Sequence, residues 1–77
     1  MKELVEVLAK SLVDHPEQVI VTETEQDNEI LLTLKVASED MGKVIGKQGR
    51  IAKAIRTVMK SVAAKENKKV SVDFIEN

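Results

Sequence analysis

The stretch Val44-Ile45-Gly46-Lys47-Gln48-Gly49-Arg50 decides how this chain folds. Two glycines enclose two polar residues, an apolar pair precedes them, and an arginine follows them. Because glycine adopts backbone angles that other residues rarely adopt, the pattern predicts a tight turn between two helices. The same lack of side-chain bulk lets a sugar-phosphate backbone approach the peptide closely. The stretch therefore predicts a turn that binds phosphate.

Charge is strongly polarised around this turn. Residues 41–60 contain six Lys or Arg and no Asp or Glu, whereas residues 1–40 contain three Lys or Arg against ten Asp or Glu. Residues 61–77 contain three of each, so the three segments carry +6, −7 and 0 and sum to the formal net charge of −1. A local excess of positive charge favours an anionic ligand at the turn.

Length and composition limit the possible classes of protein. The 77 residues predict a single domain over residues 1–77, with a core so small that self-association would help to stabilise it. The absence of cysteine excludes disulfides and thiolate metal sites and fits a reducing compartment. Residues 1–7 are interrupted by acids and predict neither a signal peptide nor a membrane span. We expect a cytoplasmic protein without membrane association, cofactor or metal.

The first half of the chain predicts one helix and two strands. Residues 2–14 repeat apolar side chains every three or four positions and predict an amphipathic helix that ends before Pro16. Residues 18–25 are rich in Val, Ile and Thr, and residues 29–36 alternate apolar and polar side chains. Both patterns predict strands, and the polar residues 26–28 predict the turn that joins them.

The second half predicts two helices around the glycines and a last strand. Ser38 is a favourable N-cap for a short helix, which Gly46 then ends. Residues 50–65 predict a long helix, and residues 70–75 alternate as a strand. Three helices and three strands in this order predict an α+β fold in which helices cover one face of the sheet.

The long helix at residues 50–65 has one apolar and one basic side when its residues are placed at 100° intervals. We expect the basic side to be mostly solvated and to attract an anion only at long range. Of its cations, only Arg50 is expected near the glycine turn, together with Lys43 and Lys47. The apolar side contains Ile51, Ile55, Val58, Met59 and Val62, and the basic side contains Arg50, Lys53, Arg56 and Lys60.

The short helix that ends in Ile45-Gly46-Lys47-Gln48-Gly49, followed by a basic helix and set in this order of elements, resembles a KH domain of type II. The resemblance covers essentially the whole chain, which is similar to the KhpA family of small single-KH bacterial RNA-binding proteins. It implies a non-enzymatic protein whose GxxG loop clamps about four nucleotides of single-stranded RNA. It also implies a homodimer, pairing with the larger KH-containing protein KhpB, and post-transcriptional control or RNA chaperone activity linked to bacterial growth, division and cell shape.

The expected RNA site is centred on the glycine turn. The helix that begins at Arg50 offers free backbone N–H groups and the positive end of its dipole, both suited to a phosphate. By resemblance, Gly42 matches a small position where a nucleotide can lie close, and Met41, Val44 or Ile45 lines an apolar groove opposite the second strand. The candidate RNA-binding residues are Gly42, Lys43, Ile45, Gly46, Lys47, Gln48, Gly49 and Arg50.

Other functional classes fit the sequence less well. A nucleotide-hydrolysing loop is disfavoured because only three residues separate Gly42 from Gly46, and Gln48 stands where a magnesium-binding hydroxyl is needed. His15 precedes a proline at a helix end, which is typical of a surface or capping residue. Phe74 is the only aromatic residue, which excludes a sheet that stacks bases on several aromatics. The alternative that stays open is a protein-interaction module that chiefly dimerises. Its candidate apolar surface contains Val58, Met59, Val62 and Ala63.

Overall fold

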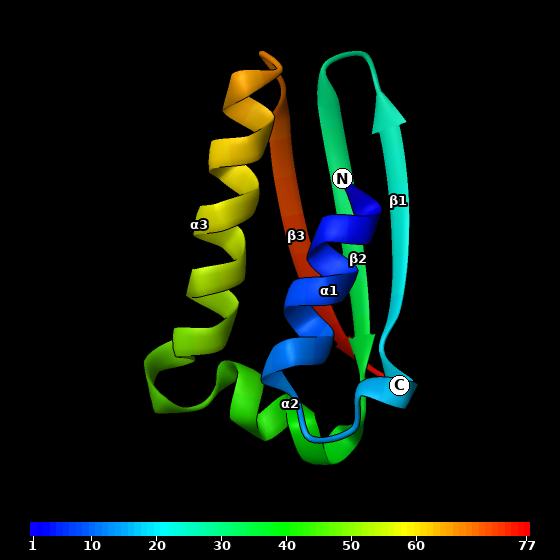
Figure 1. The fold of residues 1–77 in the computed structure, drawn as a ribbon, viewed down its shortest axis with the longest axis vertical. Coiled ribbons are helices and arrows are strands. Elements are labelled where there is room, and N and C mark those ends of the chain that lie inside the picture. Colours follow the sequence, from blue (N-terminus) through cyan, green and yellow to red (C-terminus); the bar gives the residue numbers. More distant parts are fainter.

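A three-stranded sheet and three α-helices make up the fold of residues 1–77, seen here in a computed structural model (Figure 1). The order of helices and strands and the α+β class agree with the sequence prediction. No helix is both long enough and apolar enough to cross a membrane. The elements are α1 (Lys2–Leu12), η1 (Pro16–Gln18), β1 (Ile20–Gln26), β2 (Glu29–Val36), α2 (Ser38–Ile45), η2 (Lys47–Gly49), α3 (Arg50–Lys65) and β3 (Lys69–Glu76).

The sheet has the strand order β1-β2-β3, so β2 is central and β3 is an edge strand. β1 and β2 form an antiparallel hairpin in which Gln26 lies opposite Glu29. β3 pairs in parallel with β2, with Val72 opposite Leu32. Parallel pairing requires a long crossover, which α2, η2 and α3 supply between the two strands. The outer edge of β3 has no partner strand.

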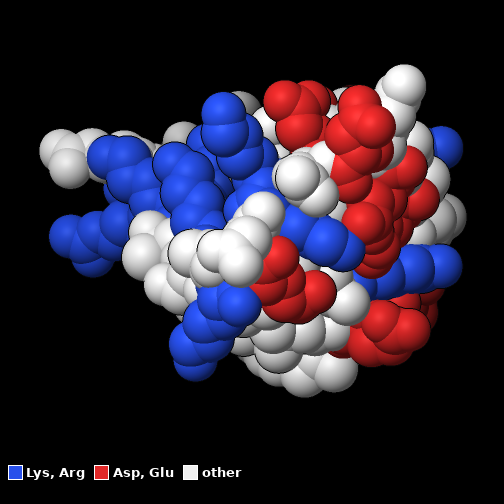
Figure 2. Space-filling model, turned by 90° about the horizontal axis from the view of Figure 1, so that it is seen from above, with Lys and Arg blue, Asp and Glu red and all other residues white.

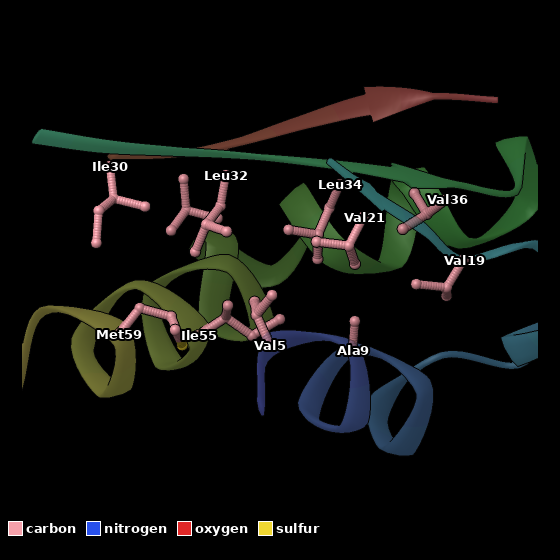
Figure 3. Packing of buried hydrophobic residues seen from close by; sticks show 11 residues of the cluster. Val5, Ala9, Val19, Val21, Ile30, Leu32, Leu34, Val36, Ile55 and Met59 are labelled. Atoms are coloured by element: carbon pink, nitrogen blue, oxygen red, sulfur yellow. The ribbon is translucent and has the colours of Figure 1, made fainter. Parts of the chain in front are cut away.

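Helices cover one face of the sheet, as the alternation in β2 predicts (Figure 3). Leu32 and Leu34 are fully buried and point from the central strand toward α1 and α3. Because the small sheet is covered on this face only, this single cluster is the core of the domain. The cluster contains Val5, Ala9, Val19, Val21, Ile30, Leu32, Leu34, Val36, Ile55, Met59 and Val72.

α1 ends at Leu12, two residues earlier than the sequence predicts. The cause is Asp40, which is 1% exposed and accepts hydrogen bonds from the backbone N–H groups of Asp14 and His15, each at 2.9 Å. These two bonds replace helical bonds and draw the chain out of α1 toward α2. The buried carboxylate therefore joins the end of α1 to the start of the helix that carries the glycine loop.

Two other local predictions differ from the structure. Pro16 begins the short 3-10 helix η1, so β1 starts at Ile20 and not at residue 18. Proline favours the first position of a helical turn, which explains this later start. Ser38 is not an N-cap: Ala37 holds that position, no side chain caps α2, and the Ser38 hydroxyl contacts the Glu39 carboxylate.

α3 spans the predicted residues 50–65, but its buried face is rotated from the predicted stripe. Its buried residues are Ala52, Ile55, Met59 and Ala63, whereas Val58 is 39% exposed. Small alanine side chains on the buried face allow the helix to lie close to the sheet. This rotation turns the basic flank of α3 toward β3.

Candidate nucleic-acid interface

The glycine loop is a tight turn that joins α2 to α3. The N–H of Gly46 donates to the carbonyl oxygen of Gly42 at 2.8 Å, which closes the last turn of α2. A Cβ atom at position 46 would clash with that same carbonyl oxygen, so only glycine fits there. Gly49 then has a φ of 69°, in the left-handed region that glycine adopts without strain. Both glycines are thus required by the path of the backbone, as the sequence predicts.

Lys47 and Gln48, between the glycines, also have left-handed backbone angles. Their φ values are 50° and 64°, which non-glycine residues rarely adopt. Residues held in such conformations cost on the order of 1–3 kcal/mol each and cluster at ligand-binding sites. Both side chains are exposed at the turn. The strain supports a binding role for the loop.

The positive end of α3 is not compensated by any acid. No side chain caps this helix, and its first turn contains no Asp or Glu. It carries instead the cations Arg50 and Lys53, next to Lys47 in the loop. A cation at a helix N-terminus is unfavourable by roughly 0.3–1 kcal/mol, whereas an anion there is favourable by a similar amount. A bound phosphate would relieve this local excess of positive charge.

A groove of about 530 Å³ lies between the loop, α3 and the edge strand β3. Ile45 forms its apolar wall near the loop and is 57% exposed, whereas Val44 is buried in the domain and Met41 packs against the core. The strand opposite is β3, not the predicted second strand, because both edges of β2 are already paired. The residues that line the groove are Ile45, Gln48, Gly49, Ala52, Lys53, Arg56, Asp73, Phe74 and Ile75.

Arg56 crosses the groove from α3 to β3. Its Nε donates to the carbonyl oxygen of Val72 at 3.2 Å, and its guanidinium lies 5.2 Å from the centroid of the Phe74 ring. The prediction that Arg50 is the only α3 cation near the glycine turn was wrong, because Lys53 and Arg56 line the groove together with Gln48 and Gly49. The sequence could have placed Lys53 and Arg56 correctly if Ala52 had been counted with Ile55 on the buried face of α3. Each of the two cations directly follows one of these buried residues.

The other candidate residues surround the groove without lining it. Gly42 is exposed on α2, and a Cβ added there would meet no atom within 4 Å. Lys43 lies on the same helix and forms an ion pair with Asp14 at 3.1 Å, which directs its charge toward the end of α1. Lys47 and Arg50 are exposed beside the turn. Three of the eight candidates, Ile45, Gln48 and Gly49, line the groove itself.

The polarised sequence becomes a polarised surface. Figure 2 shows Lys and Arg side chains gathered on the α3 side of the molecule, and Asp and Glu side chains gathered on the side of the β1-β2 hairpin. Among the acids of the hairpin, Glu25 accepts a hydrogen bond from Lys68 at 2.6 Å, and this bond raises the pKa of the Lys68 ammonium. A polyanion would therefore approach the α3 side, where the groove opens.

The helices and strands follow the order α-β-β-α-α-β. The strained glycine turn lies beside the cationic start of α3 and a groove along the edge strand β3. Together these features define a KH domain of type II. The family model described as KhpA/KhpB, KH domain, matches residues 2–74. The chain belongs to this family.

Relatives in several bacteria match over nearly the whole chain. A protein named RNA-binding protein KhpA from Clostridium perfringens is 69% identical over 75 residues, which cover 97% of this chain and 100% of that protein. Proteins of the same name from Listeria monocytogenes and Chlamydia muridarum are 53% and 49% identical over 76 residues, or 99% of this chain, and are themselves covered to 100% and 97%. No solved structure matches at a significant level.

Proposed function

We propose that this chain is a non-enzymatic RNA-binding protein whose loop Gly46-Lys47-Gln48-Gly49 clamps the backbone of short single-stranded RNA. The observation that carries the proposal is the acid-free, uncapped start of α3 beside a strained glycine turn. Membership of the KhpA/KhpB family and the names of the relatives support the same function. The proposed RNA-binding residues are the eight candidates between Gly42 and Arg50, which lie in this loop and in the adjoining turns of α2 and α3.

The loop is suited to phosphates and the groove to bases. A phosphate at the turn would accept hydrogen bonds from backbone N–H groups at the start of α3 and would be attracted by the charges of Lys47 and Arg50. The bases that follow would lie in the groove against Ile45 and the edge of β3. Single-stranded RNA is recognised in this way because its unstacked bases can turn into a groove.

The free edge of β3 offers backbone groups to those bases. The N–H groups of Lys69 and Asn77 donate toward β2, and the carbonyl of Val72 points outward to Arg56. Backbone groups of alternate strand residues point to the same side, so the N–H and C=O of Phe74 face the groove. These two groups would give the site a modest base preference.

The proposed cellular role is post-transcriptional regulation or RNA chaperone activity linked to bacterial growth, division and cell shape. A single KH unit with few contacts binds weakly, so two linked sites in a homodimer would raise the effective affinity. Pairing with the larger KH-containing protein KhpB would act in the same way. We further propose that the protein binds RNA in the cytoplasm and that it needs no cofactor, metal or membrane.

The test replaces both loop side chains with aspartate, in the variant Lys47→Asp/Gln48→Asp. Aspartate tolerates left-handed backbone angles, so the fold should be unchanged by circular dichroism. We expect the affinity for a fluorescent single-stranded RNA, measured by polarisation, to fall by about tenfold or more. The control Lys2→Asp reverses the charge of one lysine, as Lys47→Asp does, but at the start of α1, and it should retain most of the binding. Equal affinity of the loop variant and the wild type would refute the proposal.

A protein-interaction module is the second candidate function. The observation that favours it is Val58, which is 39% exposed on α3 and lies outside the core. Val62 is partly exposed beside it, but Met59 and Ala63 are buried and are not available for a partner. The predicted dimer surface is therefore smaller than the sequence suggests. Sedimentation that shows only monomer at high concentration would exclude this candidate.

A further inference from the structure

A second hollow continues the groove along the edge of β3. It has a volume of about 290 Å³ and is lined by Arg56, Lys60 and the first half of β3, from Val70 to Asp73. Arg56 and Asp73 line both hollows, so the two meet at this pair of residues. The surface beside β3 is therefore one path that begins at the glycine loop and extends to Lys60.

Cations follow this path at regular spacing. Lys53, Arg56 and Lys60 are separated by three and four residues, which places them on the same flank of α3. The bond from Arg56 to Val72 shows that this flank faces β3. With a rise of 1.5 Å per residue, Lys60 lies about 10 Å beyond Lys53 along the helix. The rise per nucleotide of a stacked strand is roughly 3.4 Å, so the two lysines would face different nucleotides.

The cations of this flank form no ion pair within the protein. Lys10, Lys43 and Lys68 form ion pairs with acids, whereas Arg56 and Lys60 form none. The one carboxylate on the path belongs to Asp73, on the β3 side. It would repel phosphates, so a polyanionic backbone would follow α3, with its sugars and bases toward β3.

Arg56 is held in place at the junction of the two hollows. Its Nε is bonded to Val72 and its guanidinium lies over the Phe74 ring, while its other N–H groups are free for a ligand. An arginine fixed in this way loses little conformational freedom when it binds a phosphate.

We propose that the RNA site continues past the loop groove, with Arg56 at the junction of the two hollows and Lys60 beyond it holding phosphates of the nucleotides that follow those at the loop. The inference rests on the proposed RNA binding and adds to it a longer site. It predicts that RNA of eight nucleotides makes a contact with Lys60 that RNA of four nucleotides does not reach.

The experiment compares fluorescent single-stranded RNAs of four and eight nucleotides by polarisation at 0.1 M salt, using the full chain. The test variant is Lys60→Gln. The matched control is Lys65→Gln, which removes the same charge from the same helix. Five residues at 100° each place Lys65 about 140° around the helix axis from Lys60, on a different flank. Loss of one phosphate contact changes the salt slope by about 0.7, which corresponds to about fivefold in affinity at this salt concentration.

We expect Lys60→Gln to weaken the eight-nucleotide RNA by about fivefold and to leave the four-nucleotide RNA within about the change seen for Lys65→Gln. If Lys60→Gln leaves the affinity for the longer RNA unchanged, or lowers the affinity for both lengths equally, the longer site is overturned. The proposed RNA binding stands in that case as long as the wild-type protein binds the RNAs. Absence of wild-type binding to either RNA would overturn both proposals.

Discussion

Replacing Gly42 with alanine separates the stability of the fold from binding of a ligand. Gly42 lies in the interior of α2 and is exposed, and an added Cβ meets no atom within 4 Å. Alanine in a helix interior is more stable than glycine by roughly 0.5–1 kcal/mol. For a domain of this size, 1 kcal/mol shifts the melting temperature by about 4–8 °C, so Gly42→Ala should raise it by about 2–8 °C.

The same substitution should weaken RNA binding. If a nucleotide lies against α2 at Gly42, the new methyl group occupies space that the ligand needs. A loss of about 1.4 kcal/mol in contacts is a tenfold loss of affinity. Gly42 weakens an exposed helix although an added Cβ would meet no atom of the protein, and close approach of a ligand would account for the missing side chain.

The assay pairs thermal unfolding by circular dichroism with RNA polarisation. Ser61→Ala is the control, because Ser61 is exposed on α3 away from the groove and alanine also improves helix propensity there. The control should raise stability slightly and leave RNA affinity unchanged. A more stable Gly42→Ala protein with wild-type affinity would refute close approach at this position, and a less stable one would contradict the structure of α2.

Further substitutions test three features: the loop, the buried carboxylate and the surface of α3. Gly46→Ala should cost about 1–3 kcal/mol in urea unfolding because its Cβ clashes with the Gly42 carbonyl, and wild-type stability would contradict the loop geometry. Asp40→Ala should cost about 3 kcal/mol because it leaves two N–H groups unpaired, whereas Asp40→Asn keeps an acceptor and should cost less; equal losses would argue against these bonds. Val58→Asp should remain folded and be monomeric in sedimentation, whereas Met59→Asp should unfold the domain, and the reverse pattern would contradict the orientation of α3.

Much of the fold was predictable from the sequence because its patterns are local. The alternation in residues 29–36 gave β2 with the observed bounds, and the spacing of apolar residues gave α3 over residues 50–65. The glycine turn was predictable for a similar reason, since clashes and backbone angles at Gly46 and Gly49 depend on their own neighbours. These features do not need knowledge of distant contacts.

The remaining features depend on contacts between distant residues. Asp40 ends α1 through bonds to residues 25 and 26 positions earlier, and no local pattern announces such a pair. The position of Arg56 follows from the burial of Ala52 on α3. The sequence did not reveal this burial because an alanine carries little weight in an apolar stripe. The identity of the opposing strand also follows from strand order, which places β3 and not β2 at the edge.

The most direct test of RNA binding by the glycine loop is an NMR titration of the wild-type protein with a short single-stranded RNA. We predict that the largest amide shift changes fall on the loop from Gly46 to Gly49, on the first turn of α3, and on Phe74 at the edge of β3. The uncovered face of the sheet, including Thr22 and Thr33, should change little. Shift changes that are largest on that face, or absent from the loop at saturating RNA, would contradict the account.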